Sequence, residues 1–220
     1  SNYDVACQVA LSEALIDTRF VLVSRELAAA GLPASERELQ LSELDRGFRA
    51  QQYRSQLREL GATLERLVRR LLTRPAGLGA CVERILAQME AEVPQLYAAG
   101  ARRKSDFFRD LAGSRYLALA EQEARTTSVG FDVLAGLFDK AILQVENSTA
   151  AAGRFEDHAR AAVAGLEQAE PCLAAAVERA ALVEIEQVGS VGTGYGRQRL
   201  PFPEAQIRSG LAQLATVSAE

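Results

Sequence analysis

The chain has 220 residues, enough to bury one large hydrophobic core or two small ones. Aromatic residues make up only 6% of it and tryptophan is absent, which favours the aliphatic packing of helical bundles. A net charge of -4 disfavours nucleic acid as a partner, because sequence-independent binding needs a clustered cationic face. Three widely separated cysteines indicate neither a disulfide framework nor a zinc site, and no apolar run reaches the roughly 20 residues that cross a membrane. We therefore expect a cytoplasmic protein that needs no metal or other cofactor and binds no membrane.

The first half of the chain predicts three helices. Apolar residues recur at helical spacing over 3–30, as one bent helix or two short ones. Ser35 can cap a second helix and Glu38 can complete its capping box; the apolar stripe that follows continues for roughly 40 residues. A third helix is expected over about 77–99, where Pro94 either kinks or shortens it.

The second half predicts shorter helices. They are expected over about 107–124, from a cap at 126–128 to about 147, over 154–168 and over 171–188, and a Gly/Pro-rich loop at 189–203 precedes a last helix at 204–217. No stretch shows the period of two that marks a strand. The sequence therefore predicts a single all-α domain over 1–220, an antiparallel bundle of about eight or nine helices.

Residues that support catalysis are scarce. His158 is the only histidine, so a zinc-binding HExxH motif is impossible and a catalytic triad would depend on this one residue. We expect His158 to be solvated or to cap a helix. The glycine-rich stretch 189–196 lacks the GK[ST] ending of a phosphate-binding loop, and we interpret it as a linker. The chain is therefore not expected to be an enzyme.

Arginines on the predicted long helix are candidates for an anion site. Arg46, Arg49 and Arg54 lie near one face of that helix, and Arg58 continues the series. Several guanidiniums on one face can bind a phosphate through bidentate, charge-assisted hydrogen bonds. They can equally pair with neighbouring carboxylates as ordinary surface ions. Spacing alone leaves both interpretations open.

Two short segments resemble the 14-3-3 family of phosphopeptide-binding adaptors. Residues 32–46 are similar to the opening of the family's long third helix. Residues 115–118 (Arg-Tyr-Leu-Ala), followed by Glu121, resemble the Arg-Tyr-Leu-Ala-Glu of its fifth helix. The predicted order of helices is similar over most of the chain. The family's Asn that holds the bound peptide backbone has no counterpart, since no Asn follows Asn147.

The resemblance implies a 14-3-3-like bundle that acts as a non-enzymatic adaptor for phosphorylated or acidic peptide segments of partner proteins. It places Arg46, Arg115 and Tyr116 at groove positions of the family, and Arg54 fits a further groove arginine one residue out of register. The resemblance also implies a homodimer formed through residues 3–30. The apolar surface for that interface would come from Leu11, Leu15, Val23 and Leu27.

Two other functions stay open. A helical regulatory or interaction protein would display an exposed apolar groove to its partner. A helical sensor domain would instead hold a small ligand in a closed pocket between helices.

Overall fold

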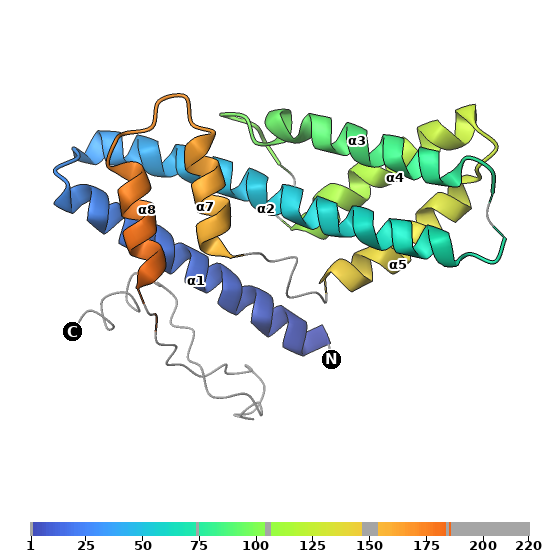
Figure 1. Ribbon diagram of the computed structural model, residues 1–220, viewed down its shortest axis with the longest axis horizontal. Coiled ribbons are helices and arrows are strands. Elements are labelled where there is room, and N and C mark those ends of the chain that lie inside the picture. The colour runs from blue at the N-terminus through green and yellow to red at the C-terminus, as the bar shows by residue number, and fades with distance from the viewer. Residues whose placement is uncertain (1, 74, 104–106, 147–153, 184, 186–220) are drawn as a thin grey trace. The chain divides into compact units, whose positions relative to one another are not determined.

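The computed structural model describes residues 2–73, 75–103, 107–146, 154–183 and 185, and the side chains of 2–11 and 146 are not described. These residues form seven helices and no strand, which confirms the predicted all-α class. The helices are α1 (Asn2–Ala29), α2 (Ala34–Arg70), α3 (Leu78–Leu96), α4 (Phe108–Thr126), α5 (Phe131–Glu146), α7 (Phe155–Ala164) and α8 (Leu173–Leu182), as Figure 1 shows. The loop and helix predicted at 189–203 and 204–217 lie outside the described residues, so the count of eight or nine helices stays a prediction.

The chain divides into two compact units. Of the described residues, those within 2–45 and 155–185 belong to unit 1, and those within 46–154 to unit 2. Helix α2 contributes its first residues to unit 1 and the rest to unit 2. The expectation of one domain over the whole chain stays a prediction. No helix in the described part of the chain is long and apolar enough to span a membrane.

The boundaries of the first three helices refine the sequence predictions. Helix α1 is one unbroken helix of 28 residues, which decides between the two alternatives that its periodicity left open. The predicted cap at Ser35 is wrong, because the amide of Arg37 already donates to the carbonyl of Pro33 at 2.9 Å. Ser35 therefore lies in the first turn of α2. Helix α3 contains Pro94 and ends two residues later, at Leu96.

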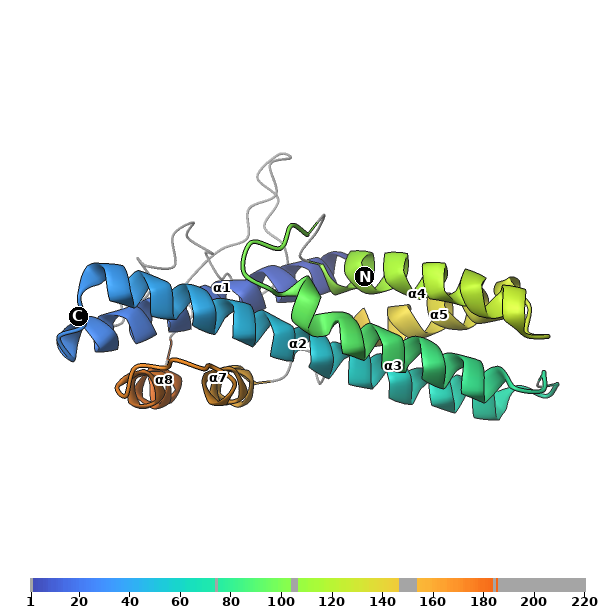
Figure 2. The same cartoon turned by 90° about the horizontal axis from the view of Figure 1, so that it is seen from above.

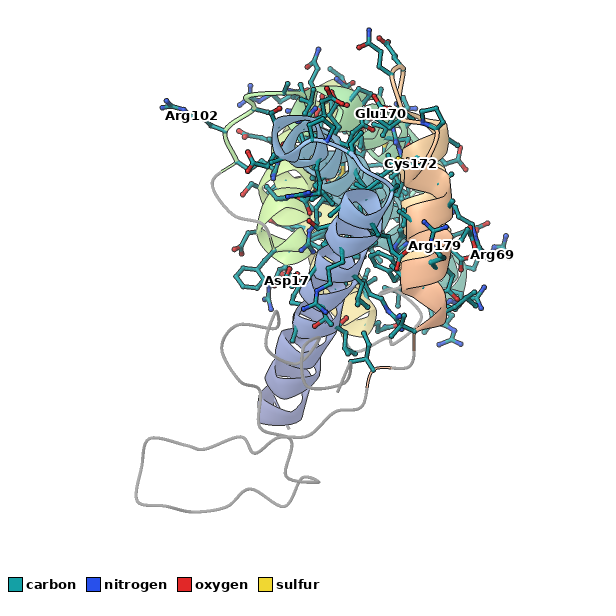
Figure 3. The ribbon with its side chains drawn as sticks, turned by 90° about the vertical axis from the view of Figure 1, so that its left-hand side faces the viewer. Asp17, Arg69, Arg102, Glu170, Cys172 and Arg179 are labelled. Carbon is teal, nitrogen blue, oxygen red and sulfur yellow. The ribbon has the colours of Figure 1, made fainter. Side chains whose placement is uncertain are left out.

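In unit 1, α8 packs against α1 and α7 lies beside α8. Figure 2 looks along α7 and α8 and shows this pair side by side. The guanidinium of Arg19 on α1 donates to the carbonyls of Ala180 and Val183, where α8 ends. A cation at this position satisfies carbonyls that have no partner within the helix and interacts favourably with the helix dipole. On the body of α8, Arg179, labelled in Figure 3, forms an ion pair with Glu26 of α1.

A buried glutamine holds the loop between α7 and α8. The side-chain amide of Gln40 on α2 donates to the carbonyl of Gln168 at 2.9 Å, and its oxygen accepts from the amide of Glu170 at 3.1 Å. Gln40 is 5% exposed, so both of its polar atoms form hydrogen bonds away from water. One side chain thus positions the start of α8, and Figure 3 shows Glu170 and Cys172 there.

In unit 2, the remainder of α2 packs with α3, α4 and α5 around one apolar core. Consecutive helices run antiparallel, as Figure 1 shows. An ideal Cβ built on Gly61 would lie 3.3 Å from Cδ1 of Leu86, so this glycine allows α2 and α3 to approach closely. The largest side chains of the core include Leu60, Leu64, Ile85, Met89, Tyr116, Leu134, Phe138 and Ile142.

Candidate functional site

Two carboxylates of α3 flank the stripe that the helix buries. Met89 and Val93 belong to that stripe, and Glu90 and Glu92 lie between them in sequence. Residues two apart on an α-helix are separated by about 200° around its axis. Glu90 and Glu92 therefore lie at opposite edges of α3, where each pairs with a different neighbouring helix.

The edge of α3 that faces α4 carries two complementary ion pairs. Glu92 accepts from both Nε and Nη2 of Arg115, the first at 2.5 Å. Glu123 accepts from Arg84 Nε at 3.0 Å and from its Nη2 at 2.6 Å. The partners lie eight residues apart on both helices, and each helix carries its arginine before its glutamate. Because the helices run antiparallel, each arginine meets the glutamate of the other helix. Such a pattern favours one antiparallel register of α3 and α4. The guanidinium of Arg115 is therefore already paired, with Glu92.

These hydrogen bonds change the acid–base behaviour of both carboxyl groups. The hydrogen bonds from Arg115 hold the pKa of the Glu92 carboxyl below its ordinary value, and those from Arg84 do the same for Glu123. A carboxyl whose pKa is lowered by folding stabilises the fold above its ordinary pKa. That stabilisation is lost as the pH falls through the lowered pKa, so we expect the α3–α4 contact to weaken in acid.

Tyr116 lies in the core of unit 2. Tyr116 is 0% exposed, and its ring stacks on that of Phe138 of α5 with a centroid distance of 4.7 Å. Burial raises the pKa of its hydroxyl, which has no hydrogen-bond partner among the described residues. The structure therefore does not bring this hydroxyl to the surface beside the guanidinium of Arg115.

Removing the hydroxyl of Tyr116 is expected to stabilise the protein. A buried hydroxyl without a partner has lost its hydrogen bonds to water, so Tyr116→Phe should raise the free energy of unfolding by about 1 kcal/mol. Urea denaturation followed by circular dichroism measures the change. A clear loss of stability would show instead that the hydroxyl forms a hydrogen bond in solution.

The opposite edge of α3 faces two arginines of α2, Arg54 and Arg58. They form fewer hydrogen bonds to carboxylates than Arg115 does. Arg54 Nε donates to Oε1 of Glu90 at 2.8 Å, in the one contact that joins the two side chains. Arg58 follows one helical turn later, is exposed, and forms no ion pair with any residue in the described part of the chain. We call Arg54, Arg58 and Glu90 the α2–α3 arginine surface.

The other arginines of the predicted series lie nearer the start of α2. Arg46 precedes Arg54 by eight residues, about 12 Å along the axis, and is half-buried. The Nη1 atom of Arg49 donates to the Gln52 side chain at 3.1 Å. The structure thus groups Arg54 with Arg58, while Arg46 lies two turns away on α2. Arg115 of α4 pairs with Glu92 at the other edge of α3.

Two of these features were not part of the predicted site. Arg58 belongs to the arginine series considered for an anion site but is not among the binding residues that the family resemblance implies, and Glu90 received no role. Antiparallel pairing of α2 with α3 was the signal that could have identified both, because it determines which arginine faces a carboxylate. His158 differs as well: it is buried, 7% exposed, on α7, so the expectation that it is solvated is wrong. The alternative that it caps a helix stays a prediction.

Part of the apolar surface predicted for a dimer is used within unit 1. Val23 and Leu27 are both 0% exposed. Leu15 is half-buried, and the side chain of Leu11 lies outside the described ones. Val23 and Leu27 therefore cannot supply the interface without unpacking unit 1. The homodimer itself stays a prediction.

Comparisons with protein-family models, with curated proteins and with solved structures find no match to this chain, and the resemblance to the 14-3-3 family stays a prediction.

Proposed function

We propose that the chain is a non-enzymatic helical domain that binds a phosphorylated or acidic segment of a partner protein at the α2–α3 arginine surface. The observation that carries the proposal is how few carboxylates pair with the guanidiniums of Arg54 and Arg58. Arg58 is exposed without a described counter-ion, and Arg54 beside it is held by one contact with Glu90. Guanidiniums one turn apart on a helix are close enough to donate to the same anion.

Phosphate suits this surface for two reasons. It carries a charge of about −1.5 to −2 at pH 7 and three strong acceptor oxygens, enough to accept from both guanidiniums at once. Arg54 has a side chain only 27% exposed, so its charge is less screened by water than that of a fully exposed arginine. A carboxylate of the partner offers the same geometry with less charge.

The test is calorimetric titration of a phosphoserine peptide library against the wild-type chain and its Arg54→Ala and Arg58→Ala variants. Each charge-assisted hydrogen bond contributes about 1.5–3 kcal/mol, so each variant should bind at least about tenfold more weakly. Arg69→Ala is the matched control, because Arg69 is an exposed arginine of α2 that pairs with Glu65 on its own helix. We expect that control to bind as the wild type does.

Arg115→Ala separates this proposal from the arrangement that the family resemblance implies. Arg115 is engaged by Glu92 at the other edge of α3, so its loss should leave peptide affinity unchanged. No binding by the wild type would refute the proposed function. Equal binding by the wild type and by the double variant of Arg54 and Arg58 would refute it as well.

A further inference from the structure

The α2–α3 arginine surface includes an anionic group of the chain itself, the carboxylate of Glu90. The Glu90 carboxylate occupies the Nε donor of Arg54 at 2.8 Å, which is a position that an incoming phosphate oxygen would take. Glu90 is a residue of the chain itself, so its local concentration beside Arg54 is high and constant. A ligand that uses both arginines must therefore displace it.

The exposure of the pair indicates that displacement is feasible. The side chain of Glu90 is 47% exposed and that of Arg54 is 27% exposed, so the carboxylate can turn into water without opening the core. Exposed ion pairs of this kind are weak, because both charges are well solvated when apart. The Glu92–Arg115 pair at the other edge differs, since its two parallel hydrogen bonds hold the carboxylate more firmly.

We infer that Glu90 is an internal competitor that holds Arg54 in the free protein and sets the affinity of the α2–α3 arginine surface for a phosphorylated peptide. This inference rests on the proposed function. Glu90 acts in two ways: it occupies the donor that the ligand needs, and its negative charge repels the ligand. Repulsion grows with the charge of the ligand, so Glu90 opposes a phosphate more strongly than a carboxylate.

The test replaces the carboxylate by a neutral group of the same shape. Glu90→Gln should bind a phosphoserine peptide about twofold to fivefold more tightly than the wild type, the range set by breaking one exposed ion pair. The same peptide with Glu in place of phosphoserine should gain less. Glu90→Ala provides a second variant in which the side chain can form no hydrogen bond at all, and it should tighten binding in the same direction.

Glu92→Gln is the matched control, since it makes the same chemical change two residues away, at the α3–α4 edge. It should leave peptide affinity unchanged. A double-mutant cycle isolates the competition: in an Arg54→Ala background, Glu90→Gln should give a smaller gain than in the wild type, because the donor it frees is absent.

The outcomes distinguish this inference from the proposed function. If the wild type binds the phosphopeptide and loses affinity on Arg54→Ala, while Glu90→Gln leaves affinity equal or lowers it, the competitor role is refuted and the binding surface stands. An equal gain from Glu90→Gln and Glu92→Gln would also refute it, because the effect would then be one of net charge. If no peptide binds the wild type or Glu90→Gln, both ideas fail together.

Discussion

Replacing Phe138 by alanine is expected to lower the free energy of unfolding by about 3–5 kcal/mol, the usual cost of deleting a buried aromatic side chain. Phe138 is 3% exposed, stacks on Tyr116, and fills the space beside Gly113, where an ideal Cβ would lie 3.5 Å from its ring. The deletion would leave a cavity between α4 and α5. Urea denaturation followed by circular dichroism measures the loss.

Leu143→Ala on the same helix is the control for this prediction. Leu143 is 50% exposed, so its loss should change stability by less than about 0.5 kcal/mol. Similar effects of the two variants would mean that α5 presents a different face to the core than the structure describes.

Leu27→Ala is expected to destabilise the protein by about 2–5 kcal/mol, because Leu27 is 0% exposed in unit 1, where α8 packs against α1. The family resemblance places the same residue at a dimer interface. The two roles differ in their dependence on concentration: loss of a core contact lowers stability equally at all protein concentrations, whereas loss of a dimer contact has an effect that depends on concentration. Denaturation at two concentrations a hundredfold apart separates them.

Leu39→Ala provides the comparison within unit 1, since Leu39 is 57% exposed on α2 and its removal should be nearly neutral. Sedimentation of wild type and Leu27→Ala completes the test. A dimer of the wild type that dissociates in the variant, without loss of stability in the folded monomer, would contradict the packing described here.

The helices were largely predictable because helix formation depends on local spacing. The leucine stripe of α2 and the pattern of α3 place apolar residues three and four positions apart, and such a pattern indicates a helix whatever packs against it. The helix ends were predicted less accurately. The expectation that α2 begins at a Ser35 cap failed because the Pro33 carbonyl accepts the first hydrogen bond, which the capping-box pattern does not reveal.

The candidate site was harder to predict, because it depends on which helices become neighbours. Arg115 and Tyr116 are adjacent in sequence and about 100° apart on α4, so one lies at the edge with Glu92 while the other enters the core. The Arg-Tyr-Leu-Ala motif by itself is equally compatible with a site in which both side chains bind the same ligand. Nothing local distinguishes Arg54, which meets Glu90, from Arg58, which does not.

The sequence by itself determined the all-α class of the described residues and the approximate extent of α1 to α5, since both follow from composition and periodicity. Only the tertiary structure decided the roles of individual side chains: Arg115 joins α4 to α3, Tyr116 packs on Phe138, and Leu27 belongs to a core within one chain. The physical reason is that burial and ion pairing arise between segments far apart in sequence. A guanidinium is available to a ligand only if no carboxylate from another helix reaches it first.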